Sequence, residues 1–188
     1  MVPLRAHGCQ NVDVVPIRLF TGALLVVVLA VVATPALGST SDPTPNQIKI
    51  AVHSAERSKR LWATINVCDT RKHPRTIGIR GEAPALGFPA TISISIAVDF
   101  YSKADKRFEP DPNATKMIKL GPVSHGIHQR GVMFQFARHA GRLRGTATFS
   151  WTRRGKVLGS TKRVTTPSHH DADFGDPSGF SAATCMIK

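Results

Sequence analysis

The 188-residue sequence contains only three cysteines, and this scarcity excludes several classes of small protein. Three thiols cannot support a disulfide-dense miniprotein, a zinc site made of four cysteines or an iron–sulfur cluster held by four thiolates. Aromatic residues are also sparse, at 6% of the chain. The hydrophobic fraction of 41% nevertheless suffices for a packed core, and the length predicts one ordinary domain.

Acidic residues are scarce as well: 12 Asp and Glu stand against 25 Lys and Arg, a formal net charge of +13. No acidic residue occurs from Pro112 to His170, a stretch that holds eleven Lys and Arg. Such a basic segment attracts polyanions, and arginine forks suit phosphate, sulfate or carboxylate groups. The residues that we expect to contact a polyanion are Arg142, Arg144, Arg153, Arg154, Lys156, Lys162 and Arg163. The alternative is a surface charge that only keeps the protein in solution.

Long apolar runs are absent except for Leu19–Ala33, which follows two arginines near the N-terminus. A helix needs about 20 apolar residues to cross a bilayer core, so this run of 15 is short for a permanent span. Small residues at Ala36 and Gly38 match the pattern that signal peptidase cleaves. The sequence predicts a signal peptide over 1–38, a secreted or extracellular-surface protein, and no transmembrane span after cleavage. An uncleaved N-terminal anchor is the alternative.

Cleavage after Gly38 removes Cys9 and leaves Cys68 and Cys185, which an oxidising compartment favours as a disulfide. The bridge would close a loop of about 118 residues, for which the chain-entropy model gives roughly 4–5 kcal/mol. A reactive thiol is the alternative, although neither cysteine belongs to a C-x-x-C motif. We divide the mature chain into a Pro-rich linker over 39–47 and a β-sandwich domain over 48–188.

The mature sequence lacks any convincing helical period and shows short alternating runs between Gly and Pro residues. Thr91–Tyr101 is the clearest: its apolar residues alternate strictly with polar or small ones, as in a half-buried strand. Eight or nine such runs at roughly ten-residue spacing predict a sandwich or a barrel. The expected strands are Ile48–His53, Leu61–Cys68, Arg75–Arg80, Thr91–Tyr101, Thr115–Leu120, Val132–Ala137, Arg142–Thr152, Lys156–Thr165 and Ala182–Ile187. Long loops are expected over Lys103–Ala114 and Pro167–Gly179.

One hairpin can be tested by its register. A two-residue turn at Arg154-Gly155 places positions that sum to 309 opposite each other. Arg144 and Arg163 then share the outer face, and Lys162 lies beside Ala147 on the core side. A lysine is unfavourable there, so the register predicts a β-bulge or a three-residue turn.

Catalytic motifs are missing: the sequence has no H-E-x-x-H, G-x-S-x-G, Walker or dinucleotide-binding pattern. We expect no cofactor, and we lean towards a protein that is not an enzyme. His169–Asp176 is the stretch richest in metal-ligand side chains, but its order departs from a calcium loop and is typical of a solvated turn. A small secreted hydrolase that uses Asp and His from this loop is the alternative.

Three segments together carry a resemblance: Trp62–Thr70, Leu143–Trp151 and Asp176–Cys185. They resemble small secreted proteins of high-GC Gram-positive bacteria that have immunoglobulin-type sandwiches and no assigned activity. The resemblance runs from Leu61 to the C-terminus and implies a fold and a compartment, not a reaction. The position of the second cysteine in the final expected strand departs from antibody domains.

We therefore expect an all-β protein: a single immunoglobulin-like antiparallel sandwich of about seven to nine strands with one disulfide. We expect it to act as a non-catalytic module that binds an anionic wall polymer, acidic polysaccharide or anionic lipid headgroups. A dedicated nucleic-acid reader is disfavoured, because Phe134, Phe136, Phe149 and Trp151 alternate as core residues do. A module that binds a protein partner through its loops is the remaining alternative.

Overall fold

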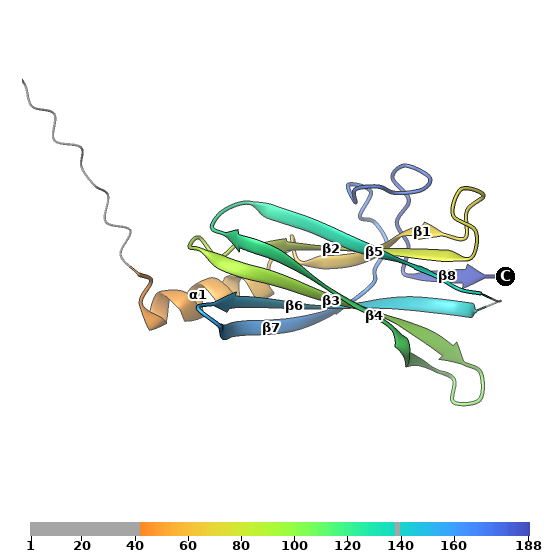
Figure 1. Ribbon diagram of the computed structural model, residues 1–188, viewed down its shortest axis with the longest axis horizontal. Helices are drawn as coiled ribbons and strands as arrows, with labels where there is room; N and C mark the ends of the chain where they lie inside the picture. The colour runs from red at the N-terminus through yellow and green to blue at the C-terminus, as the bar shows by residue number, and fades with distance from the viewer. Residues whose placement is uncertain (1–41, 138–139) are drawn as a thin grey trace, which may run out of the picture. The chain divides into compact units, whose positions relative to one another are not determined.

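The computed structural model describes residues 42–137 and 140–188 of the chain (Figure 1). The described elements, in chain order, are α1 (Pro45–Glu56), β1 (Trp62–Cys68), β2 (Thr76–Pro84), β3 (Ala90–Ser102), β4 (Arg107–Val123), β5 (Ile127–Gln135), β6 (Gly141–Arg153), β7 (Lys156–Val164) and β8 (Thr184–Ile187). The prediction of an all-β domain with seven to nine strands is confirmed.

The strands form two antiparallel sheets. Sheet A has the order β1-β2-β5, and sheet B has the order β4-β3-β6-β7, with β8 paired to the beginning of β6. In an immunoglobulin domain, strands A, B and E lie side by side in one sheet and C′, C, F and G in the other. The described strands reproduce both orders, so the predicted immunoglobulin-like sandwich is confirmed. None of them takes the place of strand D.

The core lies between the sheets because β3 and β6 alternate apolar and polar residues. Ile92, Ile94, Phe149 and Trp151 are fully buried, and burial of an apolar side chain of this size contributes about 1.5–3 kcal/mol. Gly81 on β2 provides the space for Phe149, since a Cβ atom there would lie 2.9 Å from the Phe149 ring. The alternation of apolar and polar residues therefore determines both that these segments form strands and which face of each strand is buried.

The N-terminal element is a helix, and the strand predicted over Ile48–His53 is wrong. Thr44 caps the helix: its hydroxyl accepts a hydrogen bond from the Gln47 amide, and the Gln47 side chain accepts one from the Thr44 amide. This T-P-x-Q capping box, with Pro45 in the first turn, was a readable helix signal. The helix begins inside the range 39–47 that we had assigned to a linker.

The helix α1 packs against sheet B through Val52. A Cβ atom on Gly159 of β7 would lie 2.3 Å from a Val52 methyl group, so only glycine permits this contact. Val52 and Ala55 are the buried residues of α1, and both belong to the core.

The loop predicted over Lys103–Ala114 is wrong for most of its length, because β4 already begins at Arg107. The register between β3 and β4 shifts between Ala97 and Asp99, where β4 contributes extra residues around Pro112. A proline cannot donate a ladder hydrogen bond, and a bulge in an edge strand accommodates it.

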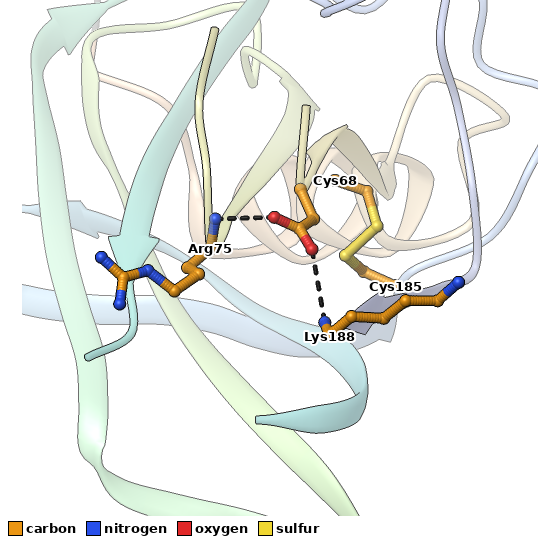
Figure 2. Close-up of a disulfide and its surroundings, with 5 residues drawn as sticks. Cys68, Arg75, Cys185 and Lys188 are labelled. Atoms are coloured by element: carbon orange, nitrogen blue, oxygen red, sulfur yellow. Dashed lines mark hydrogen bonds between the residues drawn. A yellow bond between two sulfur atoms is a disulfide. The ribbon is translucent and has the colours of Figure 1, made fainter. Parts of the chain in front are cut away.

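The predicted disulfide is confirmed. Cys68 and Cys185 have Cα atoms 5.5 Å apart, within the range of a disulfide, and the bond joins β1 to β8 (Figure 2). Next to it, a carboxylate oxygen of Asp69 accepts a hydrogen bond from the Arg75 amide at 2.7 Å, and the other accepts one from the Lys188 amide at 3.3 Å. The C-terminal strand is therefore held both covalently and by hydrogen bonds.

The segment 165–183, which contains the predicted Pro167–Gly179 loop, runs beside β1 before it enters β8 (Figure 1). Ile65 and Ala182 exchange two backbone hydrogen bonds, and the Asp176 amide donates to the Asn66 carbonyl. These contacts cover the outer edge of β1, which would otherwise present unpaired backbone groups. We call this segment the C-terminal strap.

Several predictions lie outside the described residues: the signal peptide over 1–38, its cleavage after Gly38, and the loss of Cys9. Within the described ranges, no helix has the length and apolar character that crossing a membrane requires.

Candidate functional site

The structure distributes the seven predicted basic residues over three places. Arg142 and Arg144 lie at the beginning of β6, whereas Arg153, Arg154 and Lys156 surround the β6–β7 turn. A strand rises about 3.3 Å per residue, so the two groups are separated by roughly 30 Å along β6. Lys162 and Arg163 lie between them on β7. The seven residues therefore do not gather in one compact cluster.

Arg142 and Arg144 meet two aromatic rings from the β3–β4 hairpin. The Arg142 guanidinium lies 5.7 Å from the Tyr101 ring centre and 5.6 Å from that of Phe108, and Arg144 lies 4.4 Å from Phe108. The two rings contact each other edge to face, at 5.3 Å. These cation–π distances fix the guanidinium groups against partly exposed rings. We call Tyr101, Phe108, Arg142 and Arg144 the hairpin cluster.

Arg144 also has a structural task, because it neutralises the buried Asp99. The Asp99 Oδ2 atom accepts hydrogen bonds from Arg144 Nε at 3.2 Å, from Arg144 Nη2 at 2.9 Å and from the Thr146 hydroxyl at 2.9 Å. A buried carboxylate without such partners would be strongly destabilising. Arg142 has no such role and is exposed, so it is the cation of the cluster that is open to a ligand.

The turn residues are held by one carboxylate near the beginning of the described chain. Asp42 lies 2.5 Å from Arg153 Nη2 and 2.7 Å from Arg154 Nη2. The hydrogen bond from Arg154 is the main cause of the lowered pKa of Asp42. Arg153 also donates to the Pro89 carbonyl at 3.2 Å, and its side chain is only 16% exposed. Lys156 is exposed and lines a groove between α1 and β7.

The hairpin prediction is confirmed at its turn and in its bulge. Arg154 and Gly155 both have positive φ, as a two-residue type I′ turn requires. A register shift follows between Trp151 and Thr152, and further along β7 Lys162 pairs with Thr148. The expectation that Arg144 and Arg163 share a face is wrong, because the bulge turns Arg163 to the inner face. There its guanidinium donates a hydrogen bond to the Glu56 carbonyl at the end of α1.

The outer face of sheet B carries most of its free positive charge on the flanking strands. Cross-strand partners share a face, so Lys119 on β4, Lys162 on β7 and Arg142 on β6 point outward with Arg144. Among the cross-strand pairs of this face, Asp99 is the one acidic residue, and Arg144 binds it. Between the flanking lysines, β3 and β6 carry short hydroxyl side chains on this face. Ser93 and Thr146 are buried, and the partly exposed ones are Thr91, Ser95, Thr148, Ser150 and Thr152.

Sequence reasoning did not select Lys119, Tyr101 or Phe108. Lys119 belongs to the acid-free stretch but falls in a weakly alternating strand, and Tyr101 and Phe108 are brought together only by the register of β3 and β4. Pairing of the clear strand over Thr91–Tyr101 with the next strand was the signal that could have found them.

A second polar cluster lies on the outer face of sheet A, beneath the C-terminal strap. Glu82 is fully buried and lies 2.8 Å from Arg60 Nε through Oε1, while its Oε2 atom accepts hydrogen bonds from Arg60 Nη2 and Gln129 Nε2, both at 2.9 Å. The contact at Oε1 is held by charge, since its geometry is outside hydrogen-bond alignment. Burial raises the pKa of Glu82 above its ordinary value, against the effect of Gln129 and Arg60.

Individual residues of the C-terminal strap contact side chains at or near this cluster. Asp171 lies 3.3 Å from Arg60, and the Trp62 ring stacks on His169 with ring centres 4.4 Å apart. Burial lowers the pKa of His169. Asp176 accepts a hydrogen bond from the Thr70 hydroxyl. Among residues 42–137 and 140–188, no three His, Cys, Asp or Glu side chains lie close enough together to hold a metal ion.

Comparison with known proteins adds no relative: no family model, curated protein or solved structure matches the chain.

Proposed function

We propose that the protein is a non-catalytic binding module that lays an anionic polymer along the outer face of sheet B. Arg142, Lys119 and Lys162 would pair with its charges. The observation that carries the proposal is the imbalance of charge on this face, where four basic side chains meet one carboxylate that is already bound by Arg144. The N-terminal sequence predicts that the mature chain lies outside the cell. The anionic ligands that it could meet there are wall polymer, acidic polysaccharide and anionic lipid headgroups.

The spacing of the cations favours an extended ligand. Lys119 and Lys162 lie on strands that are three positions apart, about 14 Å, and Arg142 lies roughly 20 Å from Lys162 along the strand direction. A single small anion cannot bridge these distances, whereas a polymer with repeated charges can. The short Ser and Thr side chains between the lysines let a chain approach the sheet and offer hydroxyl groups to it.

The hairpin cluster supplies an apolar contact at one end of this face. Tyr101 and Phe108 are partly exposed beside Arg142, so a sugar ring can stack there while its acidic group pairs with the guanidinium. The same arrangement can accept a base of a single-stranded nucleic acid. A ligand panel has to decide between a sugar polymer and a single-stranded nucleic acid. We favour the acidic polysaccharide or wall polymer, because the Ser and Thr hydroxyl groups of β3 and β6 can hydrogen-bond sugar hydroxyls.

The test is retention of the chain from Ser39 onward on wall polymer, acidic polysaccharide, anionic vesicles and nucleic acid, each with a salt titration. R142Q/K162Q removes two free cations from the face, and R71Q/K72Q removes two exposed cations from the β1–β2 loop as a matched control. We expect the face variant to lower the slope of log affinity against log salt by roughly one unit for each lost contact. The control variant should bind like the unchanged protein.

A third variant, R154Q/K156Q, tests the cations at the β6–β7 turn. We expect it to bind as well as the control, because these residues lie at the opposite end of β6 from the hairpin cluster. Equal losses in all three variants would mean that affinity follows net charge alone, and the proposal would be wrong. A loss confined to R154Q/K156Q would move the binding site to the turn.

A further inference from the structure

The outer face of sheet A holds an arginine whose surroundings differ from those of the other cations. Arg80 on β2 faces outward, and its side chain passes over Gly131 on β5, where a Cβ atom would lie 3.3 Å from Arg80 Nε. The Phe174 ring of the strap lies above the guanidinium, 4.9 Å from its central carbon. The guanidinium is therefore enclosed between the sheet and an aromatic ring.

The Arg80 guanidinium has a hydrogen-bond donor that lacks an acceptor among the described residues. Its Nε–H group is buried and has no hydrogen-bond partner, and no carboxylate of the described residues lies within ion-pair distance of it. Burial lowers the pKa of Arg80; Asp173 opposes this and Arg130 adds to it. Leaving a buried donor unpaired is costly, so a cation in this state is unusual unless an external group completes it.

The loop that carries Phe174 is held in place at considerable backbone cost. Phe174 has φ of 56°, a conformation that is strained for an aromatic residue, and its side chain is 79% exposed. Asn66 Nδ2 donates to the carbonyls of Asp173 at 2.8 Å and of Phe174 at 3.2 Å, and the Asp173 amide donates to Gln129 Oε1 at 3.0 Å. Strain that is maintained by surrounding hydrogen bonds is characteristic of binding sites.

We propose that Arg80 is an oxyanion-binding subsite that takes a carboxylate or phosphate group. The guanidinium fork would donate to the ligand oxygens, Arg130 would add positive potential, and Phe174 would contact an apolar or aromatic part attached to the anionic group. The subsite belongs to sheet A, so it does not depend on polymer binding at the outer face of sheet B.

The probes are sodium acetate, sodium benzoate and inorganic phosphate, added to the ¹⁵N-labelled protein with sodium chloride at equal ionic strength as reference. The readout is the Nε–Hε cross-peak of Arg80, identified by its absence in R80K. We expect saturable shifts with at least one oxyanion and none with chloride. Acetate and phosphate distinguish the two kinds of group, and benzoate should bind more tightly than acetate because of its contact with Phe174.

Matched variants separate binding from structure. R80K keeps the charge but loses the planar fork, and the shifts of the Asp173 and Phe174 amides should then require at least about tenfold more oxyanion. If R80K does not fold, the exposed R130Q variant decides, with an expected weakening of about threefold. Equal shifts with chloride, or saturation unchanged in R80K or, where that variant is unfolded, in R130Q, would overturn the proposal.

Discussion

Removal of Arg60 should destabilise the protein more than removal of both Arg60 and Glu82. Glu82 is fully buried, whereas the Arg60 side chain is half exposed. The variant R60A leaves a buried carboxylate without its cationic partner, although Gln129 still donates a hydrogen bond to it, while R60A/E82Q leaves a neutral amide of the same shape. The single variant therefore retains a desolvated charge that the double variant lacks.

The magnitude follows from the burial of one partner. Breaking a buried ion pair costs about 3–5 kcal/mol, and the solvent-exposed half of Arg60 reduces this to roughly 2–3 kcal/mol for R60A. For R60A/E82Q we expect a loss of about 1 kcal/mol, which reflects the remaining contacts of Arg60. At about 2–4 °C for each kcal/mol in a domain of this size, the two variants should differ in Tm by roughly 5 °C.

The pH dependence gives a second readout with a defined sign. Because burial raises the pKa of Glu82 above its ordinary 4.5, the folded state binds this proton more tightly than the unfolded chain. Ionised Glu82 therefore lowers the free energy of unfolding. This loss of stability is complete at pH values above the pKa of Glu82 in the folded state, and it disappears as the pH falls below that pKa towards 4.5. Loss of Arg60 raises this pKa further, so the gap between R60A and R60A/E82Q should narrow as the pH is lowered from 7.

The assay is urea unfolding followed by tryptophan fluorescence at several pH values, with R57A, at the C-cap of α1, as a matched control for the loss of an exposed arginine. Trp62 stacks on His169 at the strap and reports on this region. If R60A and R60A/E82Q unfold at the same urea concentration at pH 7, Glu82 does not carry the buried charge that the structure assigns to it.

Two further changes test the packing. Replacing both Cys68 and Cys185 by alanine should cost about 2–5 kcal/mol in urea unfolding, because the bridge closes a long loop; an intact mass that does not rise by about two daltons on reduction would contradict the bridge itself. The substitution Gly159→Val should cost about 1–3 kcal/mol, since its side chain would collide with Val52 of α1. Hydrogen exchange should show the loss of protection concentrated in α1, and a uniform loss would contradict the contact.

The fold was largely predictable because the alternation of β3 and β6 depends on local sequence alone. The bulge after Arg154-Gly155 was predictable for the same reason, since an unbulged register would have placed Lys162 in the core. The helix α1 was missed because Ile48–His53 was interpreted as one of the short strand-like runs, although the Thr44 capping box precedes it. The early beginning of β4 depends on an irregular register around Pro112, which no local pattern specifies.

The candidate site was less predictable because charge in a sequence does not reveal its internal partners. Arg144 binds buried Asp99, Arg153 binds Asp42 and the Pro89 carbonyl, and Arg163 binds the end of α1. Each of these arginines stabilises a contact within the fold, so its substitution would disturb the structure as well as any ligand contact.

The cations that one face can offer to a polymer are therefore far fewer than the 25 Lys and Arg residues of the sequence. On the outer face of sheet B, Arg142, Lys119 and Lys162 are exposed, and no carboxylate in the described part of the chain lies within ion-pair distance of them. Since each contacting cation contributes about 0.7–0.9 to the slope of log affinity against log salt, a site made of these three gives a slope near −2 to −3. A slope several times steeper would require the whole basic surface, and a specific face could not then be the explanation.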